Sequence, residues 1–154
     1  MTWDEVISDP VLQNLPFKIE LNRFGQMLMS PANNKHGRIQ FRTGREIDRR
    51  KNNGEVITEC AIQTSDGVKV ADVAWASDSF LAEHGDTSPY QKAPEICVEV
   101  VSPSNTKEEI ETKVELYLAR GALEVWVVNN QKEIRVYTHT GETKKSKLIP
   151  SIKL

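Results

Sequence analysis

The sequence has few of the residues that build disulfides or zinc sites. It contains two cysteines, Cys60 and Cys97, and three scattered histidines. A structural zinc ion takes about four such ligands at close spacing, so we expect no site of that kind. Both cysteines fall in strand-like stretches, which is typical of reduced core residues and favours a cytoplasmic protein.

Long apolar runs are also missing. No stretch approaches the roughly 20 apolar residues that span a bilayer, and the start, MTWDEVISDP, carries acids where a signal peptide would be apolar. We therefore expect no association with membranes. The chain also lacks a Gly-rich phosphate loop, and Ser102-Pro103-Ser104 lacks the glycines that flank a hydrolase nucleophile.

The charge balance excludes a uniformly basic protein. There are 20 Lys and Arg against 22 Asp and Glu, which gives a formal net charge of -2. Such a balance argues against a general nucleic-acid coat protein, but it allows a local basic patch that binds phosphates. The length of 154 residues, without repeats or a long linker, predicts a single domain over residues 1–154.

The sequence does contain a clear series of strand and helix signals. Thr2 and Thr106 each begin a capping box, and the Ser-Asp-Gly turn at 65–67 is a strong hairpin signal. The predicted helices cover about 3–8, 34–50, 77–84 and 107–120, and the predicted strands cover 17–23, 26–30, 55–64, 68–76, 94–101, 124–129 and 133–138, with the tail 144–154 as a further edge strand. This order predicts an α/β fold in the broad sense (α+β), with one long helix before and one after the central strands.

Two carboxylates lie in the middle of apolar strands. Asp72 lies in VKVADVAWA and Glu99 in ICVEVV, each on a face with small or apolar neighbours. Burying an unpaired charge is costly, so each acid needs a partner or a function. If the two strands are neighbours, the carboxylates lie close together and favour a shared hard cation such as Mg²⁺. The alternative is that each acid caps a loop or pairs with an arginine.

A lysine on the helix after Glu99 borders the same region. Ile110, Val114 and Tyr117 form a buried stripe, and Lys113 lies beside it. The short loop before this helix returns it next to Glu99, so the Lys113 ammonium can hold a nucleophilic water or stabilise charge on a phosphate. The alternative is that the Lys113 side chain snorkels to solvent or pairs with Glu109 on the same helix.

A stripe of arginines follows the long helix before the central strands. The arginine stripe consists of Arg38, Arg42, Arg45 and Arg49. Their helical spacing lines one narrow face, which suits the backbone phosphates of DNA. A solvated helix face, or an interface with an acidic partner, explains the same pattern. His36 and Gln40 flank the inward face, where His36 is either a contact of the site or a satisfied core residue.

The order of these motifs resembles a known family. VADVAWAS, PEICVEVVSPSN and KEEIETKVELYLARGALEVWVVN occur in the register of the bacterial putative restriction endonuclease family, and KIELNRFGQMLMSPANNKHGRIQF is similar to its N-terminal hairpin and first core helix. The similarity covers roughly residues 15–140. That family belongs to the PD-(D/E)XK nuclease superfamily. The resemblance implies a restriction-endonuclease-like mixed β-sheet flanked by helices, and Mg²⁺-dependent cleavage of phosphodiester bonds.

The resemblance also implies roles for individual residues. Asp72 matches the aspartate of the Pro-Asp pair and Glu99 matches the acid of the (Asp/Glu)-x-Lys element, so both are implied metal ligands. Glu20 matches an N-terminal acid that completes the site. Val101 stands where the motif lysine is expected, and Lys113 matches a lysine that this family has moved to the next helix. The proline before the aspartate is also replaced, by alanine.

The first hypothesis is therefore an endonuclease that hydrolyses DNA with Mg²⁺ or Mn²⁺, the ion polarising the phosphate and acidifying a bound water. Asp72, Glu99 and Lys113 are the expected catalytic residues, and His36, Gln40 and Tyr117 the expected secondary contacts. The alternative is a catalytically inactive nucleic-acid-binding or interaction protein that keeps the nuclease fold. A third possibility is a structural subunit whose arginine stripe contacts another protein. Exposed sheet edges favour a homodimer.

Overall fold

The computed structural model describes all residues from 1 to 154, in eight strands and five helices. The helices are α1 (Trp3–Ser8), α2 (Pro10–Gln13), α3 (Asn34–Arg50), α4 (Asp78–His84) and α5 (Lys107–Ala119). The strands are β1 (Phe17–Leu21), β2 (Met27–Pro31), β3 (Glu55–Thr64), β4 (Gly67–Ala76), β5 (Ile96–Val100), β6 (Glu124–Val128), β7 (Ile134–Thr138) and β8 (Gly141–Thr143). None of the helices has the length and apolar content that crossing a membrane requires.

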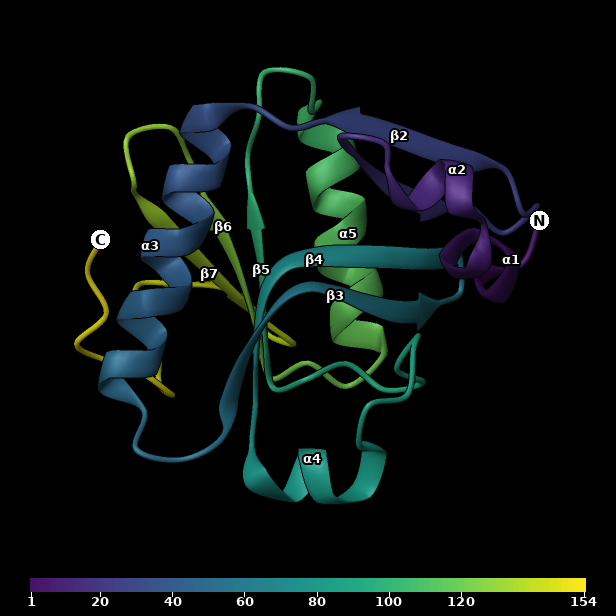
Figure 1. The fold of residues 1–154 in the computed structure, drawn as a ribbon. Coiled ribbons are helices and arrows are strands. Elements are labelled where there is room, and N and C mark those ends of the chain that lie inside the picture. Colours follow the sequence, from purple (N-terminus) through teal and green to yellow (C-terminus); the bar gives the residue numbers. More distant parts are fainter.

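The main sheet is mixed and lies between two helices. Its six strands run in the order β3-β4-β5-β6-β7-β8, and β5 and β6 form the parallel pair while the other neighbours are antiparallel. Helix α5 connects the parallel strands along one face, and Figure 1 shows α3 on the opposite side of the sheet. The predicted fold class, a mixed sheet flanked by helices, is confirmed.

The alternation of side chains in β5 explains why both faces are covered. Ile96, Val98 and Val100 are buried on the α3 side, in one hydrophobic cluster with Ile39 and Ile47 of that helix. The intervening residues point to the other face, where the core includes Cys97, Val125 and the α5 residues Ile110, Val114 and Tyr117. Because β5 is buried on both faces, Glu99 enters the interior beneath α5 instead of reaching solvent.

Strands β1 and β2 form a separate two-stranded ribbon. Figure 1 shows this ribbon next to α2, at the end of the bent β3–β4 hairpin. The turn of that hairpin approaches β1 so closely that a Cβ on Gly67, whose φ is +79°, would lie 2.3 Å from the Leu21 carbonyl oxygen. Glycine is therefore required at this contact. The contact places the β1 side chains Lys18 and Glu20 over β4.

The structure agrees with the predicted helices and the first strands, and it corrects the C-terminal end. No strand forms over residues 144–154; the last strand, β8, precedes this segment. The reason is Glu124, a buried acid at the start of β6. Its carboxylate accepts hydrogen bonds from the Ser146 hydroxyl and from the Lys147 and Leu148 backbone amides at 2.6, 2.8 and 3.1 Å. These bonds hold the tail in an irregular conformation of bends and a turn. The short helix α2 was not predicted.

Candidate active site

The site forms where β4 and β5 separate. The pairing of these antiparallel strands ends at Val73 and Val98, so the next residues in register are Asp72 and Glu99. At this point the backbone amide of Val100 donates to Asp72 Oδ2 at 2.7 Å, which replaces a ladder hydrogen bond by a bond to a side chain. The two carboxylates therefore lie side by side, at 1% and 2% exposure.

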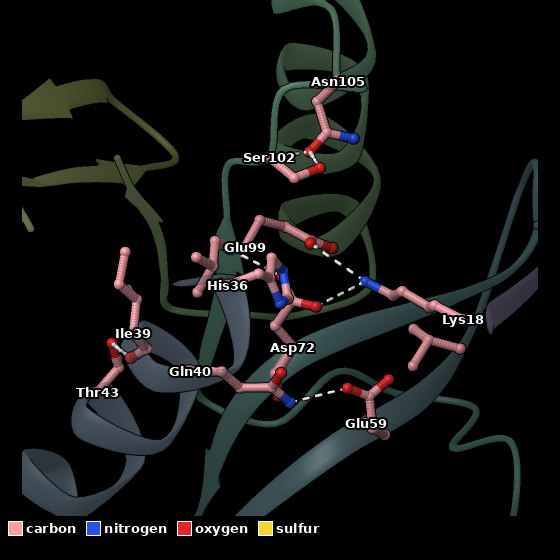
Figure 2. A network of polar contacts seen from close by, with 12 residues as sticks. Lys18, His36, Ile39, Gln40, Thr43, Glu59, Asp72, Glu99, Ser102 and Asn105 are labelled. Carbon is pink, nitrogen blue, oxygen red and sulfur yellow. Dashed lines mark hydrogen bonds and ion pairs between the residues drawn. The ribbon is translucent and has the colours of Figure 1, made fainter. Parts of the chain in front are cut away.

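The other edge of β4 is also interrupted at this residue. The pairs Thr58–Val73 and Cys60–Ala71 leave Glu59 and Asp72 unpaired between them, and Glu59 has a φ of +53°. Gln40 fills the gap, because its side-chain amide donates to the Asp72 carbonyl at 2.9 Å and to Glu59 Oε1 at 2.7 Å. Figure 2 shows Gln40 reaching from α3 to both strands. The break in the β3–β4 ladder is thus stabilised by α3.

A lysine that the sequence analysis missed lies between the two carboxylates. Lys18 Nζ is 2.9 Å from Asp72 Oδ1 and 3.4 Å from Glu99 Oε2, as Figure 2 shows. It comes from the β1–β2 ribbon and not from the main sheet. One feature of the sequence could have indicated Lys18. Side chains alternate along β1, so Lys18 lies on the same face as Glu20, which was already a candidate ligand.

Three more charged residues complete the site: Lys113 from α5, Glu20 from β1 and His36 from α3. Lys113 Nζ lies 2.8 Å from Glu20 Oε2 and 3.2 Å from Glu99 Oε1. The Tyr117 hydroxyl donates to the same Glu99 oxygen at 2.7 Å. From the first turn of α3, His36 Nε2 lies 3.3 Å from Asp72 Oδ2. The structure therefore brings together the residues that the sequence analysis named for the catalytic and secondary positions.

Burial and ion pairing act in opposite directions on the two central acids. Burial raises the pKa of Glu99 to about 7, although the charges of Lys113 and Lys18 lower it. Burial also opposes ionisation of Asp72, but the hydrogen bond from His36 and the charge of Lys18 hold the pKa of Asp72 below its ordinary value. The same hydrogen bond raises the pKa of His36. Asp72 therefore ionises easily and Glu99 does not.

The donor set fits a hard divalent cation at one position. Asp72 and Glu99 offer carboxylate oxygens, the ligands that Mg²⁺ prefers together with water. The position between them already attracts a positive charge, the ammonium of Lys18. Glu20 is engaged elsewhere, since its Oε2 accepts from the Val70 amide at 2.6 Å as well as from Lys113. No group of three or more His, Cys, Asp or Glu side chains is gathered as a metal-binding cluster.

The acids open onto a cleft of about 930 Å³. Its walls are the β1–β2 ribbon, the start of α3, the 102–106 loop and the first half of α5. Met27, Leu28 and Met29 of the ribbon, which are 40–46% exposed, give one wall an apolar surface. Seven acids and three lysines line the cleft, so it carries excess negative charge. A polyanion that enters it needs added positive charge.

The arginine stripe lies outside this cleft, along α3. Arg38, Arg45 and Arg49 are exposed and Arg42 is half-buried. Arg49 also pairs with Glu46 at 3.3 Å. The aromatic side chain of Phe41, on the same helix, is also exposed (69%). His36 and Gln40 reach the site from the opposite side of this helix, so the stripe lies on the outer, solvent-facing side of α3.

The fold and the arrangement of acids and lysine define the class of restriction-endonuclease-like proteins. The chain belongs to the Uma2 family, described as "Putative restriction endonuclease", whose model matches residues 5–150. It is also similar to the crystal structure of a protein from Anabaena variabilis that is described as a putative nuclease belonging to DUF820. The TM-score is 0.70 at 18% identity, over 99% of this chain and 82% of that one, which shows the shared fold. No curated protein matches the chain.

Proposed function

We propose that this protein is a metal-dependent endonuclease that hydrolyses DNA phosphodiester bonds. The observation that carries the proposal is the pair of buried acids, Asp72 and Glu99, which meet where β4 and β5 separate and face an open cleft. Structural carboxylates of a core are usually satisfied by backbone donors or arginine. Here the carboxylate of Glu99 accepts no hydrogen bond from a backbone amide, and its hydrogen-bond donors are two lysines and a tyrosine.

Each residue has a distinct part in the proposed reaction. Asp72 and Glu99 would hold Mg²⁺ or Mn²⁺, which supplies a Lewis acid for the phosphate and an acidified water. Lys113 stands beside Glu99 and would stabilise the negative charge that develops on the phosphate. Tyr117 and His36 orient the two carboxylates through the contacts described above, and Gln40 fixes the backbone of Asp72. Glu20 as a third ligand stays a prediction.

The arginine stripe would position the DNA backbone outside the cleft. Its exposed guanidinium groups would bind backbone phosphates on the outer side of α3, since the cleft itself carries excess negative charge. A divalent ion bound between the acids would reduce the negative charge inside the cleft. The homodimer and the cytoplasmic location also stay predictions.

Cleavage of supercoiled plasmid tests the proposal. Purified protein is expected to nick or cut the plasmid with Mg²⁺ or Mn²⁺ but not with EDTA. Asp72→Asn, Glu99→Gln and Lys113→Met are each expected to lower the rate by about 100-fold or more. Glu108→Gln is the matched control, because Glu108 is an exposed acid that lines the same cleft and contacts none of the three. If supercoiled, linear and single-stranded DNA all stay uncut with both ions, the proposal is wrong.

One observation favours the alternative of an inactive protein with the nuclease fold. Lys18 already satisfies both acids, so the site is stable without a metal ion. An inactive protein of this kind would bind DNA through the arginine stripe but would bind no divalent ion. Isothermal titration with Mn²⁺ therefore separates the two functions independently of any cleavage assay.

A further inference from the structure

We propose that Lys18 is a built-in competitor of the divalent cation, so that an ion binds between Asp72 and Glu99 only by displacing the Lys18 ammonium. The inference rests on the proposed function, because it concerns the same two acids. It goes further in assigning a task to a residue for which the resemblance implies none.

The contacts of Lys18 place it at the cation position itself. Its ammonium bridges the two acids at 2.9 and 3.4 Å, and their side chains are only 1% and 3% exposed. Both oxygens that it contacts, Asp72 Oδ1 and Glu99 Oε2, are free of any other hydrogen-bond donor. An ammonium and a divalent ion cannot use these two oxygens at the same time, because two cations at that separation repel each other.

The charges around the two acids also support competition between Lys18 and a divalent ion. Asp72, Glu99 and Glu20 face the three basic groups Lys18, Lys113 and His36. Lys113 is tied to Glu20 and Glu99, and His36 to Asp72 Oδ2, so these two groups sit to either side of the shared position. Lys18 alone touches both central acids. Removing its positive charge therefore leaves the pair without a bridging cation, whereas the flanking contacts remain.

Lys18 can leave the two acids without a change in the main sheet, because it belongs to the β1–β2 ribbon. It lies on the β1–β2 ribbon, at the wall of the open cleft, and its side chain is 16% exposed. A lysine side chain has four rotatable bonds, so the ammonium can leave the acids while β4, β5 and α5 stay in place. If Lys18 occupies the position nine-tenths of the time, the apparent affinity for the ion falls about tenfold.

Isothermal titration of the metal-free protein with Mn²⁺ and Ca²⁺ tests this. Lys18→Met and Lys18→Gln are expected to bind each ion at least about tenfold more tightly than wild type. Lys18→Arg keeps a competing cation and is expected to stay within about threefold of wild type. Lys69→Met is the matched control, because Lys69 is a buried cleft lysine that contacts Asp66 and the Leu21 carbonyl but neither acid. Its affinity should equal that of wild type.

A second measurement uses the wild-type protein, so it does not depend on how the variants fold. An amine-reactive reagent followed by peptide mass spectrometry reports the accessibility of each lysine. Saturating Ca²⁺ is expected to speed the labelling of Lys18 several-fold, while Lys107, whose side chain is 87% exposed, serves as the reference. Unchanged or slower labelling of Lys18 at a saturating concentration would overturn the inference.

The outcomes separate this inference from the proposed function. If DNA is cut but Lys18→Met and Lys18→Gln bind ions no more tightly than wild type, Lys18 is no competitor and the nuclease remains. If the variants bind more tightly and no DNA is cut, the competition stands and the nuclease proposal fails. If neither wild type nor any Lys18 variant binds an ion, both are overturned.

Discussion

The protonation of Glu99 gives a quantitative prediction for the stability of the metal-free protein. Burial raises the pKa of Glu99 from an ordinary value of 4.5 to about 7. Since one pH unit corresponds to about 1.4 kcal/mol, the raised pKa amounts to about 3 kcal/mol. The folded protein holds this proton more tightly than the unfolded chain does. The stabilisation is therefore complete below pH 4.5 and is lost as the pH rises through about 7.

The perturbation is Glu99→Gln, which keeps the shape of the side chain and removes its titration. Relative to wild type, the free energy of unfolding of this variant is expected to rise by about 3 kcal/mol between pH 4.5 and 8.5. Urea unfolding in EDTA, followed by tryptophan fluorescence, which includes the buried Trp75 and Trp126, measures the difference. The pKa of Asp72 is shifted in the opposite direction, below its ordinary value, so Asp72 stays ionised over this pH range and does not contribute to the difference.

The control for this prediction is Glu108→Gln, which removes an exposed carboxylate at the rim of the cleft. This variant should not show the rise of about 3 kcal/mol that is expected for Glu99→Gln. If the wild-type and Glu99→Gln stabilities change in parallel with pH, the ammonium groups of Lys18 and Lys113 keep Glu99 ionised in spite of its burial. That result would refute the reasoning about which effect dominates.

Three further predictions concern other parts of the molecule. Glu124→Ala removes the acceptor of four hydrogen bonds and is expected to cost about 2–4 kcal/mol in urea unfolding; an unchanged midpoint would contradict the account of the tail. Gly67→Ala is expected to cost at least about 1 kcal/mol, because of its positive φ and the contact with Leu21, and a higher melting temperature would be the opposite result. Changing Arg38 and Arg45 to Gln should reduce the slope of log affinity for DNA against log salt by about 0.9 for each lost phosphate contact; an equal slope would place the DNA elsewhere.

Most of the fold could be predicted because its signals are local. The capping boxes at Thr2 and Thr106 lie at the observed starts of α1 and α5, and the turn at 65–67 joins β3 and β4 as expected. The tail could not be predicted in this way. Its conformation depends on Glu124, a residue some twenty positions earlier. The sequence around a carboxylate in an apolar strand does not indicate which distant backbone amides that carboxylate binds.

The same difference between local and distant contacts explains what was missed at the site. Asp72 and Glu99 were found because a charge within an apolar strand is visible in the sequence. Lys18 lies in a short amphipathic strand, where a lysine is ordinary, and its partners are 54 and 81 residues away. Only the docking of the β1–β2 ribbon on β4 turns that lysine into part of the site. Neither a periodicity nor a local motif encodes this contact.

The motif lysine that is absent at Val101 has a counterpart on α5, because the two carboxylate oxygens of Glu99 have different partners. Oε1 is contacted by Lys113 and by Tyr117, both from α5, whereas Oε2 is contacted by Lys18. Val101, at the position of the motif lysine, instead packs against the core under that helix. Because α5 covers this face of the sheet, a lysine on the helix can reach Glu99 while the strand position stays apolar. Under our two proposals, only Oε2 changes its partner when an ion binds, and Lys113 remains on Oε1. One lysine therefore competes with the ion and the other stays to hold the carboxylate that binds it.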